Sequence, residues 1–338
     1  MASLRSLTTN AALSLALLPF WTAQGFAEPR VVASIKPVHA LVAAVMEGVG
    51  TPELIVGGAA SPHAYALKPS QAQALENADL IFWVGHELES FLEKPVETIG
   101  SGARAVELID ADGLTQLPFR EGGPFEAHMH EEQEDHADGD DHDHKEGEAH
   151  ADAGGDDDHG HDGHDRGFDA HLWLDPLNAK VFVRVIGEAM SETDPANAAT
   201  YAANVALTEK KLDALIDEVN ASLAPVRGKP FIVFHDAYQY FEKRFDIEAA
   251  GSITVNPEVR PSAERVAAIR DKVRDLNAVC AFSEPQFDSQ LIDVVIEGTD
   301  ARTAALDPLG ATLDDGPELY FALIRQLGAS MHDCLQGG

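Results

Sequence analysis

Short apolar runs alternate with segments of helical periodicity from residue 31 to the C-terminus. The runs have the length of buried strands, and the segments between them place apolar residues three or four positions apart. This alternation predicts an α/β fold with parallel sheets. The expected strands are residues 31–35, 53–56, 80–84, 105–109, 231–234, 247–250, 278–282 and 302–306. The expected helices include residues 88–99, 178–190, 195–223, 237–244, 262–276, 288–297 and 317–335, and two further helices begin near Pro37 and at Ser70.

One of these helices divides the alternation into two halves. It has a capping residue at Asp194, Pro195 in its first turn and apolar residues at helical spacing as far as Leu223. Its length of ~43 Å exceeds that of most globular helices, so it either spans two lobes or is an ordinary long packing helix. We predict two α/β lobes, at residues 28–190 and 228–338, joined by a linker helix at 194–224.

The first 27 residues resemble a secretory signal peptide. Arg5 is their only charge, an apolar run covers residues 11–21, and small residues precede a cleavage point after Ala27. A membrane anchor is the alternative, but the run is shorter than the ~18 residues a span needs and contains Pro19. We therefore expect export of a protein without a membrane anchor, to the periplasm if the source has two membranes.

The net charge of the chain argues against some classes of binding partner. The chain has 24 Lys and Arg against 57 Asp and Glu, a formal net charge of −33. This excess of negative charge argues against nucleic acid and anionic membrane surfaces as partners. Residues 126–169 alone contain 18 acids and two bases. They lack periodicity, so we expect a disordered loop there.

The same loop is rich in histidine. Clustered imidazoles and carboxylates on such a chain are expected to bind divalent metal at several weak sites; a solvating insertion without binding is the alternative. Nine of the 15 histidines lie there: His128, His130, His136, His142, His144, His150, His159, His161 and His164.

Three histidines outside the loop have a shared context. His63 follows one expected strand, His171 precedes an apolar strand-like run, and His235 directly follows the strand at 231–234. Ligand sites of open α/β sheets gather at the carboxyl ends of strands, and Asp307 is placed in the same way. Three imidazoles with a carboxylate or a water form a tetrahedral zinc set. Each histidine alone could equally be a hydrogen-bonded loop residue, and we assign His39, His86 and His332 partly exposed structural roles.

The only cysteines are Cys280 and Cys334. In an exported chain two cysteines suggest one disulfide, with two buried free thiols as the alternative.

These residues resemble a known family, the periplasmic zinc-binding (ZnuA-like) solute-binding proteins of bacterial ABC zinc importers. The resemblance extends from Ala33 to Cys334. It is carried by the motifs GGAASPHAYALKP (57–69), NADLIFWVG (77–85), HLWLDP (171–176), FHDAYQYF (234–241), VNPE (255–258), FSEPQ (282–286) and LDPLG (306–310), and by the acidic His-rich loop before HLWLDP.

The resemblance implies two α/β lobes joined by one long rigid helix, with Zn²⁺ bound in the cleft by His63, His171 and His235. It also implies a Cys280–Cys334 disulfide, no enzymatic activity, and a high-affinity receptor that delivers zinc to an ABC-type membrane permease, and we expect this receptor to be a monomer. One position departs from the pattern, because some relatives have Glu where this chain has Pro62. The fourth ligand is therefore left between Asp307 and a water.

Other functions fit parts of this pattern. A zinc hydrolase would also use three histidines and a water, with Asp307 or Glu284 as its base. A manganese or nickel receptor is a second alternative, although manganese-binding relatives tend to have a carboxylate at the position of His235. A surface adhesin is a third, and the absence of a cysteine for lipid attachment disfavours it.

Overall fold

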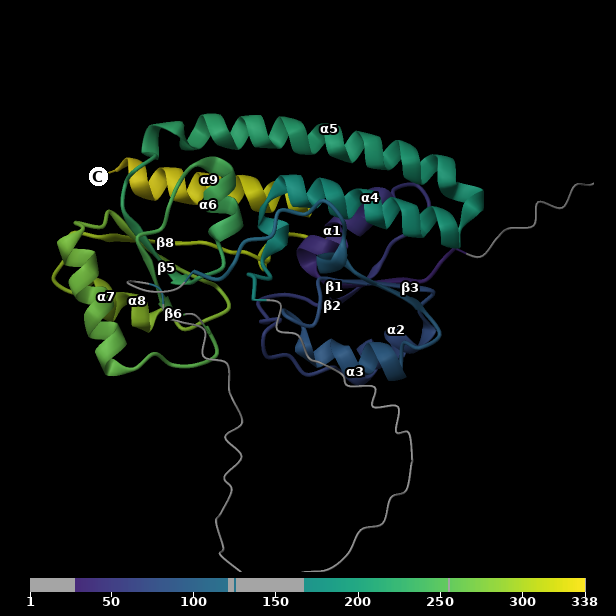
Figure 1. Cartoon of the computed structure of the whole chain (residues 1–338), viewed down its shortest axis with the longest axis horizontal. Coiled ribbons are helices and arrows are strands. Elements are labelled where there is room, and N and C mark those ends of the chain that lie inside the picture. Colours follow the sequence, from purple (N-terminus) through teal and green to yellow (C-terminus); the bar gives the residue numbers. More distant parts are fainter. Residues whose placement is uncertain (1–27, 121–124, 126–166, 255, 338) are drawn as a thin grey trace, which may run out of the picture.

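The computed structural model describes residues 28–120, 125, 167–254 and 256–337. The expected signal peptide and the nine loop histidines lie outside these residues. The described part forms two α/β lobes side by side beneath a layer of long helices (Figure 1). None of its helices combines the length and the apolar character needed to cross a membrane.

The N-terminal lobe is built on a parallel sheet with the strand order β2-β1-β3-β4. Most of its strand residues are apolar and buried, as expected for a sheet that is covered by helices. Its strands are β1 (Val31–Ile35), β2 (Glu53–Val56), β3 (Leu80–Trp83) and β4 (Arg104–Glu107). The helices within this part of the chain are α1 (Lys36–Val45), α2 (Pro69–Asn77) and α3 (Ser90–Thr98), followed by the short 3-10 helix η1 (Leu108–Asp110).

The C-terminal lobe repeats this arrangement, with parallel strands in the order β6-β5-β7-β8. In both sheets the chain reverses its direction of winding beside the first strand, and ligands of α/β sheets bind at such a point, outside the carboxyl ends of the strands. The strands are β5 (Phe231–His235), β6 (Gly251–Thr254), β7 (Cys280–Ser283) and β8 (Arg302–Ala305). The helices are α6 (Gln239–Phe245), α7 (Ala263–Asp275), α8 (Gln290–Ile296) and α9 (Leu319–Gln336).

The predicted linker is the helix α5 (Ala198–Leu223), which 3-10 turns extend at both ends as η3 (Pro195–Asn197) and η4 (Ala224–Val226). It runs above both lobes, with α4 (Pro176–Thr193) and α9 beneath it (Figure 1). Glycines allow this close packing. A Cβ atom on Gly187 of α4 would lie 2.4 Å from Val205, and one on Gly328 of α9 would lie 3.0 Å from Val219. The linker is therefore in tight contact with a helix from each side of the molecule.

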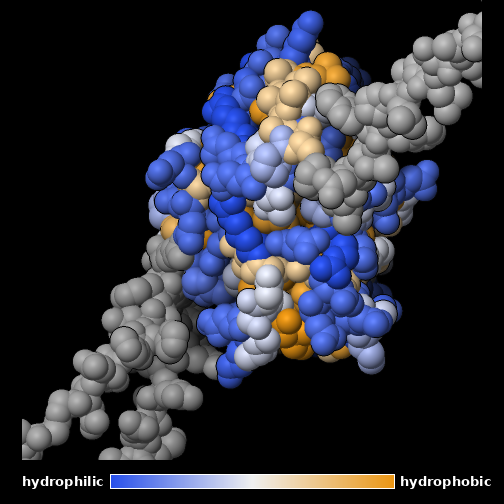
Figure 2. All heavy atoms as spheres, turned by 90° about the vertical axis from the view of Figure 1, so that its right-hand side faces the viewer, coloured by the Kyte–Doolittle hydropathy of each residue, from blue (hydrophilic) through white to orange (hydrophobic). Residues whose placement is uncertain are grey.

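Most large apolar side chains are buried, and the end of the molecule formed by the N-terminal lobe exposes mainly hydrophilic residues, with hydrophobic residues in smaller patches (Figure 2). The disulfide between Cys280 of β7 and Cys334 of α9 is present, with a Cα–Cα distance of 6.1 Å. It joins the last helix to the interior of the C-terminal sheet.

Some local predictions were wrong. The strand expected at 247–250 is β6, four residues later, because Asp246 adopts a left-handed conformation (φ 54°) at the end of α6. The backbone N–H of Ile247 then donates to Glu242 O, and that of Ala249 donates to the Glu242 carboxylate. Pairing with β5 begins only at Gly251.

The helix expected to begin at Ser70 begins one residue earlier, at Pro69, after the capping residue Lys68. The side chain of Gln71 accepts a hydrogen bond from the Lys68 backbone N–H. His39 has the predicted structural role, but it is buried rather than partly exposed, with Nε2 lying 3.0 Å from Pro52 O.

Candidate metal site

Three of the predicted ligands meet between the two lobes. His63 lies on the loop after β2 of the N-terminal lobe, and His235 is the last residue of β5 in the C-terminal lobe. His171 precedes the 3-10 helix η2 (Leu172–Leu174), which leads into α4. The ring centroids are 5.2, 5.3 and 5.7 Å apart, and one ligand atom of each histidine lies within 4.8 Å of the other two.

The run after His171 is thus a 3-10 turn and not a strand. Asp175 accepts a hydrogen bond from the Leu177 backbone N–H and caps α4, so the chain must turn tightly before this point. The turn buries its three apolar residues, and the indole of Trp173 donates a hydrogen bond to Pro308 O. His171 therefore reaches the site from the start of a helical turn, whereas the argument from sequence placed it beside a strand.

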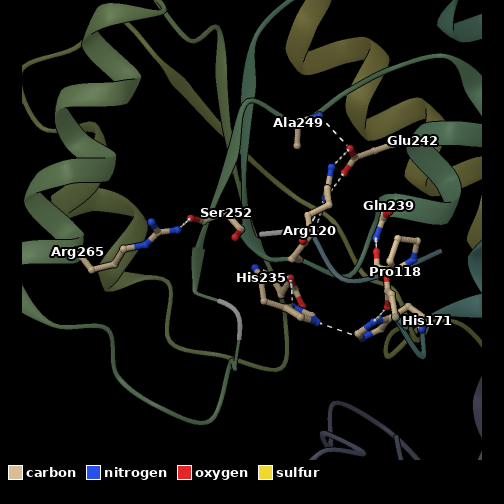
Figure 3. A network of polar contacts seen from close by, with 12 residues as sticks. Pro118, Arg120, His171, His235, Gln239, Glu242, Ala249, Ser252 and Arg265 are labelled. Atoms are coloured by element: carbon tan, nitrogen blue, oxygen red, sulfur yellow. Dashed lines mark hydrogen bonds and ion pairs between the residues drawn. The ribbon is translucent and has the colours of Figure 1, made fainter. Parts of the chain in front are cut away.

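Buried carboxylates orient two of the three imidazoles. His171 Nδ1 lies 2.7 Å from Asp169 Oδ1, and His235 Nδ1 lies 2.6 Å from Glu284 Oε1. An ionised carboxylate only accepts hydrogen bonds, so each Nδ1 carries the proton and each Nε2 is left as the free ligand atom. The two rings point these Nε2 atoms toward each other (Figure 3).

The distance between the two Nε2 atoms is 3.3 Å. Two nitrogens bound to one zinc ion at ~2.0–2.1 Å with a tetrahedral angle lie ~3.3–3.4 Å apart. When both rings are neutral, neither Nε2 has a proton to donate to the other, and two lone pairs face each other. A bound cation would remove this repulsion, and the distance suits two nitrogens that share one ion.

Electrostatics keeps one imidazole neutral. Burial lowers the pKa of His63 well below its usual value, and the positive charges that His171 and His235 can take lower it further. Burial also lowers the pKa of His235, but the charge and hydrogen bond of Glu284 outweigh it, and the pKa is raised. Metal binds only neutral imidazole, so His63 is ready to bind, whereas at His235 protons compete with the metal as the pH falls.

The space between the histidines is small. A cavity of ≈ 10 Å³ is lined by the three imidazoles together with Pro62, Trp173 and Phe287 among others. This is about the volume that one water occupies, so the site accommodates an ion or a water but not an organic substrate.

Asp307 is not brought into this group, because its carboxylate has other partners. Oδ1 accepts from the side chain of Gln286 and from the N–H groups of Leu309 and Gly310, and Oδ2 accepts from the N–H of Ala311. The carboxylate is buried where it shapes its own loop. Both bases proposed for a hydrolase are therefore committed to other contacts, Asp307 here and Glu284 at His235.

Asp169 was expected in the disordered loop, but the described structure resumes at Gly167. The Asp169 N–H donates to Leu117 O, and Phe168 pairs with Pro118. Tyr240 of α6 joins the two segments, since its hydroxyl accepts from the Leu117 N–H at 3.0 Å and donates to Asp169 O at 2.7 Å. The carboxylate beside His171 is thus held in place by the C-terminal lobe.

Further contacts attach the segment before residue 121 to the same lobe. Gln239 donates to Pro118 O, and Arg120 is ion-paired with Asp236 and Glu242 (Figure 3). The orienting roles of Asp169 and Glu284 are not among the predictions from sequence. Each lies close to a predicted ligand or to a strand end, and the pairing of buried carboxylates with metal-binding histidines could have singled them out.

A family model described as "Zinc-uptake complex component A periplasmic" (ZnuA) matches residues 31–334. A Brucella abortus (strain 2308) protein named "High-affinity zinc uptake system protein ZnuA" is 55% identical over 305 residues, covering 90% of this chain and 91% of that protein. Proteins of the same name from Paracoccus denitrificans and Yersinia pestis are 40% and 36% identical, over 98% and 92% of this chain and the same shares of their own length.

Solved structures share the two-lobed fold at low sequence identity. The periplasmic zinc binding protein TroA of Treponema pallidum has a TM-score of 0.70 over 91% of this chain and 99% of its own, at 17% identity. A mutant of the laminin-binding adhesin of Streptococcus agalactiae reaches 0.69 at 22% identity, covering 91% of this chain and 99% of its own. A crystal structure of ZnuA reaches 0.68 at 22% identity, covering 90% and 99%.

Proposed function

Because this chain belongs to the family of periplasmic zinc-uptake complex component A proteins, we propose that it captures one Zn²⁺ ion with His63, His171 and His235. Members of this family are solute-binding transport receptors and not enzymes, and the family implies a periplasmic location. Zinc is the cargo of such a protein. The observation that carries the proposal is the pair of carboxylate-anchored imidazoles whose Nε2 atoms lie 3.3 Å apart.

Zinc is favoured over other divalent ions by the ligand set. Three imidazoles are characteristic of zinc sites, whereas manganese prefers sites richer in carboxylate and water. We propose that a water completes the tetrahedron, because the Asp307 carboxylate already accepts four hydrogen bonds. Competition binding of Zn²⁺ against Mn²⁺ and Ni²⁺ at the same site distinguishes a zinc receptor from a manganese or a nickel receptor.

The second half of the proposal concerns delivery. The relatives named above belong to zinc uptake systems, which supports release of the ion to an ABC-type membrane permease.

We propose that the protein acts as a monomer and that residues 1–27 are removed on export. We further propose that residues 28–190 and 228–338 are the two lobes and that residues 194–224 are the linker between them.

The His-rich segment is proposed to collect zinc for the tight site. Its nine histidines lie between Arg120 and His171. The described residues on either side, Leu117 and Asp169, are both hydrogen-bonded to Tyr240 beside that site. Weak sites of this kind gather ions without competing with three preorganised imidazoles.

The central claim is tested by removing two ligands. We expect the His63→Ala, His171→Ala double variant to lose the tight class of zinc sites, because one imidazole alone cannot hold the ion. The measurement is zinc titration in competition with a chelator of known affinity. The His332→Ala variant is the matched control, since this histidine lies on α9 with Asp333 as its partner. Unchanged tight binding by the double variant would sink the proposal.

A further inference from the structure

A second group of metal-ligating side chains lies at the carboxyl ends of two N-terminal strands. His86 and Glu87 follow β3, and Glu107 is the last residue of β4. The strands are neighbours in the sheet, with Trp83 paired to Glu107, so the two strand ends meet. One ligand atom of each of the three residues lies within 4.8 Å of the other two.

The distances in this group are those of ligands around a single ion. His86 Nδ1 donates a hydrogen bond to Glu107 Oε1 at 3.2 Å and lies 3.4 Å from Glu87 Oε2, so an ion bound here would take the place of the Nδ1 proton. Nitrogen and oxygen ligands that bind zinc at ~2.0–2.2 Å in a tetrahedron are separated by about the same amount. The His86 backbone N–H also donates to Glu107 Oε1 at 3.2 Å, which holds that carboxylate toward the ring.

Gly85 makes the approach of the two carboxylates possible. A Cβ atom at this position would lie 2.9 Å from Glu107 Oε1 and 2.9 Å from Glu87 Oε2. Both oxygens thus border the same small space, and the Glu87 side chain is only 7% exposed. Two ionised carboxylates this close to one imidazole favour a positive charge between them, which a bound metal ion would supply.

Glu89 is buried nearby, where its carboxyl group accepts hydrogen bonds from the backbone N–H groups of Val84 and Gly85 and holds the turn that carries His86 and Glu87. With neutral His86, the three ligands have a formal charge of −2, which a divalent ion balances. The sequence predicts only a structural role for His86 and gives no sign that Glu107 lies beside it.

We propose that His86, Glu87 and Glu107 form a second binding site for a divalent cation of the zinc class. His63 follows β2 and this group follows β3 and β4, so the two sites lie at the same edge of the sheet, on opposite sides of β1. The second site binds more weakly than the first, because it has one imidazole and because His86 and Glu107 are 32% and 24% exposed.

Anomalous diffraction at the zinc edge tests this proposal, using crystals of the full chain with zinc in excess. We expect a second peak, ~2.0–2.2 Å from His86 Nδ1 and from one oxygen of each glutamate. No density there, with the three-histidine site filled, would overturn the proposal. A filled second site with an empty three-histidine site would overturn the proposed function instead.

Solution stoichiometry gives an independent readout. We expect the His86→Ala, Glu107→Gln double variant to bind one zinc ion fewer than the wild type in equilibrium dialysis, with its tight site unchanged. The His332→Ala, Asp333→Asn variant is the matched control. It makes the same kinds of substitution in a histidine–carboxylate pair at the surface that contains only one acid and is therefore not expected to bind zinc. Equal zinc content in wild type and in the first variant would contradict the second site.

Discussion

At the scale of single residues, two buried carboxylates orient two of the three histidines of the candidate site. Asp169 and Glu284 are both buried, and each uses one oxygen to hold an imidazole by Nδ1. A partner of this kind fixes the tautomer, orients the ring and raises the basicity of the ligand atom. Within the described part of the chain the His63 ring has no carboxylate partner of this kind, and burial lowers its pKa instead.

Replacing one of these carboxylates tests its role. We expect Glu284→Gln to lower zinc affinity by about 10- to 100-fold, because the amide can present a donor as well as an acceptor to Nδ1 and supplies no charge. Glu284 raises the pKa of His235, so the loss of affinity on acidification should move to lower pH in this variant. Zinc affinity measured from pH ~5 to ~8 shows both effects.

The matched control for that substitution is Glu297→Gln, which makes the same chemical change on an exposed side chain paired with Arg270. A Glu284→Gln variant that loses affinity equally at every pH would argue for packing as the cause, and not for charge.

At the scale of elements, the C-terminal helix connects the lobes and is itself covalently held. α9 packs against α5 and α1 and crosses to β8, and its disulfide reaches into β7. The cross-link closes a separation of 54 residues that contains α8 and β8. In the chain-entropy account, a loop of this length restricts the unfolded chain and so stabilises the fold.

We expect the Cys280→Ala, Cys334→Ala variant to remain folded and to lose about 2–4 kcal/mol in free energy of unfolding. Urea denaturation of the metal-free protein measures the change. Reduction of the wild type is the control, since it breaks the same bond without changing the side-chain volume. Equal stability of the oxidised and reduced proteins would show that the cross-link contributes nothing at equilibrium.

At the scale of the whole molecule, the formal charge of −33 is distributed unevenly along the chain. Residues 126–169 hold 18 of the 57 acids, and the described segments that flank this stretch are fixed to α6 beside His171. Because the stretch is joined to these flanking segments, we expect its negative charge to raise the local concentration of divalent cations and to speed their encounter with the histidines.

Deleting residues 128–164 separates the proposed roles of the loop and the cleft. We expect the total zinc bound per protein to fall while one tight site remains, as measured by dialysis and chelator competition. A variant in which the nine loop histidines are alanine, with the acids kept, shows how much of the loss is due to imidazole. A loopless protein without any tight site would overturn this division of labour.

The fold followed closely from local patterns. Apolar strand runs such as residues 80–83 and the apolar stripe of α5 depend on burial and periodicity, which neighbouring residues in the sequence already express. Errors occurred where a side chain or backbone bond from elsewhere decided the outcome. β6 begins four residues later than predicted because the backbone N–H groups of Ile247 and Ala249 are hydrogen-bonded to Glu242 at the end of α6. The 3-10 helix η2 forms where a strand was expected because α4 begins directly after it.

The sequence by itself determined which residue types were available: three histidines near the ends of predicted strands, two cysteines, and an acidic tract rich in imidazole. Only the tertiary structure decided which of them meet. Asp307 has the same sequence context as the predicted ligands, yet its carboxylate is hydrogen-bonded to backbone N–H groups and does not join the histidines. Asp169 was predicted to lie in a disordered loop, yet it is ordered and orients His171. Metal sites depend on distances of a few ångströms between residues far apart in the chain, and those distances are set by packing of the two lobes and not by local sequence.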